Sequence, residues 1–157
     1  MAAHLEKGGA LAIDEATTIV DFVRFYADGL HHVKEERVLF PAMIEAGLPH
    51  RGGPITVMIN EHELGRRHVG AMVNALQALQ TSAGRAAFAL AARHFADLLE
   101  PHIAKENNVL FTMAEGLLSD DAPLLKAYAE REAEARQLCG DKPTHEAALA
   151  ALSTRWL

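Results

Sequence analysis

The chain has a single cysteine, Cys139, among its 157 residues. One thiol cannot form an internal disulfide or a metal site built from several cysteines, and it is compatible with a reducing cytoplasm. The sequence also has no run of about 18 apolar residues and no signal-peptide pattern, so it predicts neither a membrane span nor export. We therefore expect a cytoplasmic protein without a membrane partner.

Aromatic residues are also scarce, at 6% of the chain, although 50% of its residues are hydrophobic. Apolar positions are filled mostly by alanine, leucine, isoleucine, valine and methionine, and this composition predicts an all-α fold. The net charge of -6, from 15 basic and 21 acidic residues, argues against general affinity for nucleic acid and favours a small-ligand protein. The length predicts one domain, 1–157, with a core at 10–118 and a helical extension at 119–157.

What the sequence does contain is one motif in two copies. Residues 31–40 read HHVKEERVLF, and residues 102–111 read HIAKENNVLF. The copies share His, Lys, Glu, Val, Leu and Phe at the same offsets, and the shared His and Glu lie four residues apart. On a helix such a pair shares one face and can hold a common object. Two copies on two helices would bring two imidazoles and two carboxylates together, as a metal site in a helical bundle requires.

Apolar residues recur at helical spacing on both sides of the first copy and around a third histidine, His62. The first helix is expected to have its N-cap at Asp14, to bend or break at Pro41, and to end before the Gly-Leu-Pro sequence at 47–49. The second helix is expected to begin at Pro54, whose fixed φ suits a first turn. Its apolar stripe is interrupted by one polar residue, His62.

The second copy lies on a third predicted helix. This helix follows the Thr-Ser-Ala-Gly break at 81–84 and carries His102 within its apolar stripe. Pro101 is expected to kink it beside the site, because proline removes a backbone donor and crowds the preceding turn. A further helix is expected after a cap at 119–121, and a short last one towards Trp156.

The first copy allows two registers, because His32 has a glutamate four residues later, as His31 does. Aligning the two copies matches His31 to His102 and Glu35 to Glu106, so the repeat favours His31 as the inward-facing histidine. Four other polar residues of the copies are then expected behind the ligands or facing solvent: His32, Lys34, Glu36 and Lys105.

Three helices thus place histidines in an apolar seam. A lone buried histidine or a lone His/Glu pair would ordinarily be explained by local hydrogen bonds or solvation, but ionised groups gathered in one seam need a common partner. The candidate metal ligands are His31, Glu35, His62, His102 and Glu106. Nitrogen and oxygen donors without thiolate suit iron, manganese or zinc, and two carboxylates from different helices can bridge a metal pair. The other histidines of the helices and loops are assigned no role: His50, His68, His94 and His145.

Taken in order along the chain, three stretches resemble the hemerythrin-like (HHE) cation-binding family. They are residues 31–41, 53–63 and 102–111. The resemblance covers most of the chain and is closest to bacterial hemerythrin-like and di-iron iron–sulfur-repair proteins, which use four His and two bridging Glu. It implies an up-down helical bundle holding two irons. In that bundle the terminal ligands would be His31, His62 and His102, and the bridging ligands Glu35 and Glu106.

One ligand of the family pattern has no clear counterpart here. The family places a further histidine on a helix well before the first copy of the repeat, and His4 is the one histidine upstream of that copy. His4 lies beside Leu-Glu-Lys-Gly, which resembles the end of that helix rather than its middle, so His4 is not expected to be a ligand. The first helix of the bundle is thus expected to be truncated, and the apolar groove this exposes favours a homodimer.

The leading hypothesis is a non-haem di-iron protein that binds or reacts with O₂, NO or peroxide, in sensing, stress protection or iron handling. Two alternatives stay open: a metal-free helical interaction module in which the His/Glu pairs form a hydrogen-bonded layer, and a mononuclear zinc protein. No tyrosine, cysteine or base is clearly placed for a defined catalytic step, so the sequence does not commit the chain to an enzyme activity.

Overall fold

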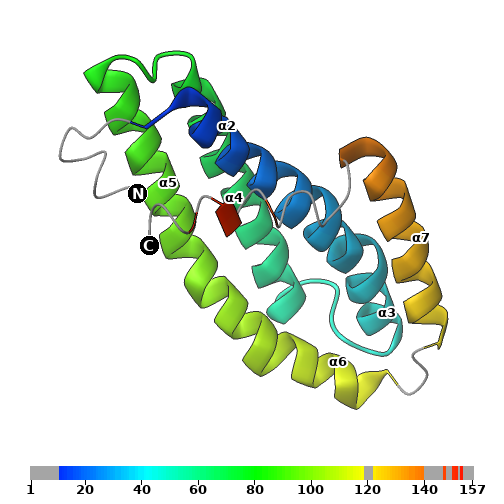
Figure 1. Ribbon diagram of the computed structural model, residues 1–157. Coiled ribbons are helices and arrows are strands. Elements are labelled where there is room, and N and C mark those ends of the chain that lie inside the picture. Colours follow the sequence, from blue (N-terminus) through cyan, green and yellow to red (C-terminus); the bar gives the residue numbers. More distant parts are fainter. Residues whose placement is uncertain (1–10, 119–121, 140–146, 148–149, 152, 154–157) are drawn as a thin grey trace.

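A computed structural model describes residues 11–118 and 122–139, together with 147, 150–151 and 153 (Figure 1). The secondary structure of this part of the chain is entirely helical, which confirms the predicted all-α class. Several sequence-based expectations fall outside the described residues: those for His4, for the cap at 119–121, for His145 and for the end of the last helix at Trp156.

The first rod of the bundle carries the first copy of the repeat. It consists of α2 (Ile13–Asp21), the π-helical segments η1 (Phe22–His32) and η2 (Glu35–Leu39), and α3 (Phe40–Glu45). The N-cap is Ala12 rather than the predicted Asp14, which lies in the first turn. Pro41 does not end the rod. It lies in the first turn of α3, where the winding changes from π to α and the missing N–H is tolerated.

The second and third rods carry the third histidine and the second copy. The second rod is α4 (Pro54–Leu76), and the third consists of α5 (Ser82–Lys105), η3 (Glu106–Leu110) and α6 (Phe111–Leu117). As the break at 81–84 predicted, Thr81 is the N-cap of α5, and its hydroxyl accepts a 2.9 Å hydrogen bond from the Gly84 N–H. A Cβ on Gly84 would lie 1.9 Å from the Ala78 carbonyl oxygen, so this turn requires glycine. Pro101 lies inside α5, which continues to Lys105.

A fourth rod, α7 (Ala122–Cys139), packs along the first rod against η1 and η2 (Figure 1). The Lys34 ammonium forms an ion pair with the Glu132 carboxylate of α7 at 2.6 Å. On the same helix, Leu124 and Tyr128 pack against apolar side chains near α3 and α6. These contacts place α7 beside the part of the first rod that carries the repeat.

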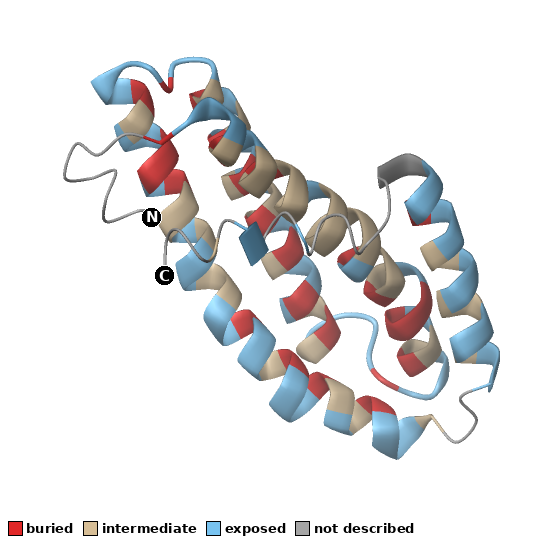
Figure 2. Cartoon of the chain, in the orientation of Figure 1, coloured by how far each residue is buried: buried red, intermediate tan, exposed pale blue. Residues whose placement is uncertain are grey.

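Two apolar clusters fill the bundle, and in the first three rods a layer of buried polar residues lies between them in the sequence. Figure 2 shows buried residues along these rods. The first cluster includes Val20, Met72, Leu79 and Phe88. The second includes Phe40, Met43, Ile55, Met58 and Leu110. Because the buried polar residues lie between these clusters, apolar packing on both sides holds their side chains away from water.

None of the described helices combines the length and the apolar character needed to cross a membrane. The single-domain organisation, the homodimer and the cytoplasmic location stay predictions from the sequence.

Candidate metal centre

Among the described residues, five polar side chains are buried: His32, Glu35, His62, His102 and Glu106. Four of them are predicted ligands, and they come from the first, second and third rods. The fifth predicted ligand, His31, lies at the edge of this layer, and its side chain is 46% exposed. The structure therefore brings all five predicted residues to one place, with His31 on its solvent side.

Each buried glutamate faces imidazoles on two sides. Glu35 lies with Oε2 3.3 Å from His62 Nε2 and with Oε1 3.7 Å from His31 Nε2. Glu106 Oε1 lies 2.9 Å from His102 Nε2 and 3.5 Å from His31 Nε2. The two carboxylates thus lie between His31 on one side and the buried histidines on the other.

The imidazoles of His62 and His102 are also held from behind. The Nδ1 atom of His62 lies 2.7 Å from Glu36 Oε1, and that of His102 lies 2.9 Å from Glu61 Oε2. A carboxylate at Nδ1 fixes the ring orientation and leaves Nε2 directed inward, which is the usual support for a histidine that binds a metal.

Cations hold those supporting carboxylates in turn. Arg66 donates to Glu36 at 2.8 Å, and Lys105 forms a hydrogen-bonded ion pair with Glu61. The predicted positions of Glu36 and Lys105 behind the ligands agree with these contacts. Lys34, expected in the same role, instead pairs with Glu132 of α7.

Both glutamates begin a five-residue π-helical segment, η2 at Glu35 and η3 at Glu106. In each copy the phenylalanine N–H at the end of the segment donates to the glutamate carbonyl five residues back, Phe40 to Glu35 and Phe111 to Glu106. Such wider turns occur often at functional sites. The sequence repeat is therefore also a repeat of local backbone geometry.

The pKa values of residues in the site are shifted because acidic and basic side chains lie close together there. Burial alone would lower the pKa of His62, but the adjacent Glu35 and Glu36 carboxylates outweigh it and raise that pKa to about 9. Burial likewise opposes ionisation of Glu106, but the neighbouring His102 and His31 imidazoles lower its pKa well below the usual range. Both shifts have the same cause, which is that imidazoles and carboxylates lie close together in this layer.

The side-chain nitrogen and oxygen atoms of this layer are better placed to bind a cation than to form hydrogen bonds with one another. In the part of the chain that the structure describes, five buried side-chain atoms have no hydrogen-bond partner: Glu35 Oε1, Glu35 Oε2, His62 Nε2, His102 Nε2 and Glu106 Oε1. His102 Nε2 lies 2.9 Å from Glu106 Oε1 and His62 Nε2 lies 3.3 Å from Glu35 Oε2, but neither contact has the geometry of a hydrogen bond. Buried polar atoms of this kind are costly unless something satisfies them, and imidazole nitrogens with carboxylate oxygens are suitable ligands for iron, manganese or zinc.

His32 was expected behind the ligands or facing solvent. The structure excludes the solvent-facing position, because His32 is only 7% exposed. Its ring stacks on His62 with centroids 3.9 Å apart, and a nitrogen of each of His32, His62 and His102 lies within 4.8 Å of the others. The signal was present in the sequence, since His32 and His31 share the same spacing to a glutamate.

A cavity of about 420 Å³ opens beside the site on the side of α7. His31 and Glu35 line it from the first rod, and Tyr128 lines it from α7. Burial and the nearby Glu35 carboxylate raise the pKa of the Tyr128 phenol to about 12. The candidate ligands are therefore accessible to a small molecule on this side, whereas apolar packing encloses them toward both ends of the bundle.

Comparison with known proteins agrees with this geometry. The Hemerythrin HHE cation binding domain matches residues 1–114. The iron-sulfur cluster repair protein YtfE of Musicola paradisiaca (strain Ech703) is 39% identical over 90 residues, which cover 54% of this chain and 40% of that protein. The protein of the same name from Edwardsiella ictaluri (strain 93-146) is 38% identical over 96 residues, which cover 55% and 41%. No solved structure matches the chain significantly.

The chain spans about two fifths of the length of these curated relatives. The family match, in contrast, covers most of the chain and includes every predicted ligand together with the supporting carboxylates Glu36 and Glu61. With the buried donor cluster on the same residues, the chain belongs to the hemerythrin HHE cation-binding domain family.

Proposed function

We propose that this chain is a non-haem di-iron domain that binds or reacts with a small molecule such as O₂, NO or peroxide. The observation that carries the proposal is the set of five unsatisfied donor atoms, which converge in one buried layer. The names of the two relatives, which are iron-sulfur cluster repair proteins, support a role in stress protection or repair.

In this proposal His31, His62 and His102 would be terminal ligands, and Glu35 and Glu106 would be the carboxylates shared by two ions. Each carboxylate lies within 3.7 Å of the imidazole nitrogens of two histidines, which fits this role. Bound iron would supply Lewis-acid and redox chemistry at this layer.

The remaining residues orient these donors and keep water out. Glu36 and Glu61 hold the Nδ1 sides of His62 and His102, so both rings present Nε2 to the layer. Arg66 and Lys105 hold the two carboxylates in place and balance their charge. The apolar clusters on either side exclude solvent, which strengthens electrostatic interactions inside.

A small ligand would enter through the cavity beside α7. This cavity reaches His31 and Glu35 and has a volume of about 420 Å³, which exceeds the size of a diatomic molecule or peroxide. The half-exposed His31 forms the boundary between this cavity and the buried layer. A second cavity, of about 330 Å³, reaches His32 beside Asp28 and Arg66, so two cavities adjoin the layer.

The first test is metal content. Protein purified without metal and reconstituted with Fe(II) under anaerobic conditions is expected to hold about two irons per chain, measured by a colorimetric iron assay. Exposure to air should then give near-ultraviolet absorption from an oxo-bridged ferric pair. Reconstitution without bound iron, or thermal stability identical with and without a chelator, would refute the proposal and favour a metal-free helical module.

A mononuclear zinc site is the second candidate, favoured by the buried trio of His32, His62 and His102. Three histidines with an open fourth position form a common zinc site. Competition between Zn(II) and Fe(II) separates the candidates, because a single zinc site would saturate at about one ion per chain. In that case Glu106→Gln should leave the stoichiometry unchanged, whereas a dinuclear site requires Glu106.

A further inference from the structure

His32 is held in the same way as the two buried histidines that were predicted as ligands. Its Nδ1 lies 3.2 Å from Asp28 Oδ1, as the Nδ1 atoms of His62 and His102 lie beside Glu36 and Glu61. All three imidazoles therefore have a carboxylate at the outer nitrogen. This common arrangement fixes the tautomer and directs the other nitrogen to one centre.

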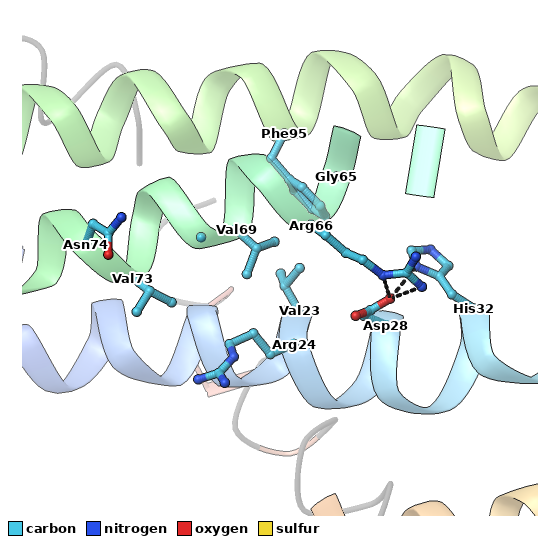
Figure 3. A pocket seen from close by; sticks show the side chains of 11 residues that line it. Val23, Arg24, Asp28, His32, Gly65, Arg66, Val69, Val73, Asn74 and Phe95 are labelled. Carbon is cyan, nitrogen blue, oxygen red and sulfur yellow. Dashed lines mark hydrogen bonds and ion pairs between the residues drawn. The ribbon is translucent and has the colours of Figure 1, made fainter. Parts of the chain in front are cut away.

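Asp28 is itself held by an arginine, as the partner of His62 is. Arg66 donates to Asp28 from Nε at 2.8 Å (Figure 3). It also donates to Glu36 from Nη2 at 2.8 Å. One guanidinium thus supports the carboxylates behind both His32 and His62. A histidine with a merely structural role in an apolar core would not require this shared support.

The rings also form one cluster. The His32 centroid lies 3.9 Å from that of His62 and 5.9 Å from that of His102. The adjacent His31 is tilted by 53° to His32 and faces the two glutamates from the other side. Two consecutive residues can contact opposite sides of the carboxylate layer because successive helical side chains point in different directions.

We propose that His32 is itself a metal ligand. It joins His62 and His102 on the buried side of the two glutamates, while His31 serves the solvent side. The chain then provides four imidazoles and two carboxylates from its described residues alone. This inference rests on the proposed di-iron function, and it assigns a role to the histidine that the repeat alignment left outside the site.

The test compares three variants after anaerobic reconstitution with Fe(II). His32→Ala is expected to lose about one iron per chain, or to bind the second iron at least tenfold more weakly in competition with a chelator. Asp28→Asn keeps the His32 ring and should weaken the same iron by a smaller factor. His50→Ala, in an exposed loop, is the matched control and should keep the iron content of the unaltered protein.

The outcomes separate this inference from the proposed function. Two tightly bound irons in both His32→Ala and the unaltered protein would overturn the role of His32 and leave the di-iron function intact. No iron in the unaltered protein would overturn both. Far-ultraviolet circular dichroism of the metal-free variants shows whether the helices form, and if His32→Ala fails to fold, a wild-type iron affinity in Asp28→Asn overturns the inference.

A second observation concerns α7, which lies beyond the residues that the family model matches. Its Tyr128 lines the same cavity as His31 and Glu35. The Lys34–Glu132 ion pair and the packing of Leu124 hold α7 at this position. A phenol hydroxyl is a hydrogen-bond donor at neutral pH. The cavity is also lined by the charged side chains of Lys34 and Glu115, and Lys34 is held by its ion pair with Glu132.

We infer that Tyr128 is a specificity-determining residue, which donates a hydrogen bond to a small anionic ligand held in this cavity at the metal centre. This second inference also rests on the proposed di-iron function. It gives the C-terminal helix a part in ligand binding, in addition to covering the first rod. The expected consequence is that removal of the hydroxyl weakens ligand binding without changing metal content.

Azide binding to the iron-loaded, air-oxidised protein tests this, followed by the visible absorption change. Tyr128→Phe is expected to bind azide about tenfold more weakly while keeping its iron content. The one other tyrosine of the chain is Tyr26, which stacks on Phe22 away from this cavity, and Tyr26→Phe is the matched control. Unchanged azide affinity in Tyr128→Phe would overturn the inference. Loss of iron in this variant would also overturn it, because the phenol would then act in metal binding instead.

Discussion

Residues 31–40 and 102–111 share one motif, yet only some of the matched residues are equally buried in the two rods. Glu35 and Glu106 are 3% and 4% exposed, and each begins a π-helical segment. Leu39 and Leu110 are buried as well. Val38 and Val109, in contrast, are 8% and 44% exposed, although they occupy the same offset.

The difference follows from what packs on each rod. The first rod lies between α4 and α7, so residues on more than one of its faces are covered. In the third rod, Val109 lies on an exposed face. The shared residues that face the site behave alike in both copies, and those that face away depend on neighbours which the repeat does not specify.

The largest expected effect concerns the two glutamates that face the site in both copies. Glu35→Gln and Glu106→Gln should each lower bound iron from about two per chain to one or fewer, because a neutral amide neither compensates nor bridges two cations. A colorimetric iron assay after reconstitution measures this. Glu115→Gln, at an exposed position on α6, is the control. Clearly unequal losses in the two variants would show that the copies are not equivalent at the centre.

The histidines at the start of each copy should differ instead. His102→Ala is expected to weaken iron binding by a larger factor than His31→Ala, because His102 is buried and supported by Glu61, whereas water can replace the half-exposed His31. Chelator competition gives both affinities. A larger loss in His31→Ala would contradict the assignment of His31 to the solvent side.

The phenylalanines that end each copy allow a comparison of packing. Phe40 is 2% exposed and lies in the apolar cluster, whereas Phe111 is half-buried at its edge. Phe40→Ala should lower the free energy of unfolding of the metal-free protein by about 3–5 kcal/mol, and Phe111→Ala by about 1–2 kcal/mol. Urea denaturation followed by circular dichroism measures both. Equal losses would mean that the third rod is covered as fully as the first.

The smallest effect concerns the contact of the first copy with α7. Lys34→Ala should cost less than about 1 kcal/mol at neutral pH, because its ion pair with Glu132 is partly exposed. Lys34 lowers the pKa of Glu132 from its ordinary value of 4.5. A lowered carboxyl pKa stabilises the fold above that ordinary value, and this contribution disappears as pH falls below it. The stability difference between Lys34→Ala and the unaltered protein should therefore vanish in acid, and a constant difference from pH 7 to pH 3 would contradict the ion-pair explanation.

The repeat was sufficient to predict that Glu35, His102 and Glu106 lie close together, and the apolar stripe was sufficient to add His62. Metal binding by these residues stays a prediction. Their spacing places each pair on one helix face, and the structure brings them together. It was not sufficient for His32, because both adjacent histidines have a glutamate four residues later. The π winding through η1, which ends at His32, sets the direction of each side chain, and local periodicity gives no sign of it.

The sequence by itself determined the all-α class, the order of the long helices and the donor types of the centre, because hydrophobic periodicity and repeated His/Glu spacing act within one helix. The tertiary structure alone decided that His32 lies in the layer, that Arg66 supports two carboxylates, and that α7 covers the first rod beside Tyr128. These features depend on contacts between residues far apart in the chain, and no local pattern specifies which helix faces meet.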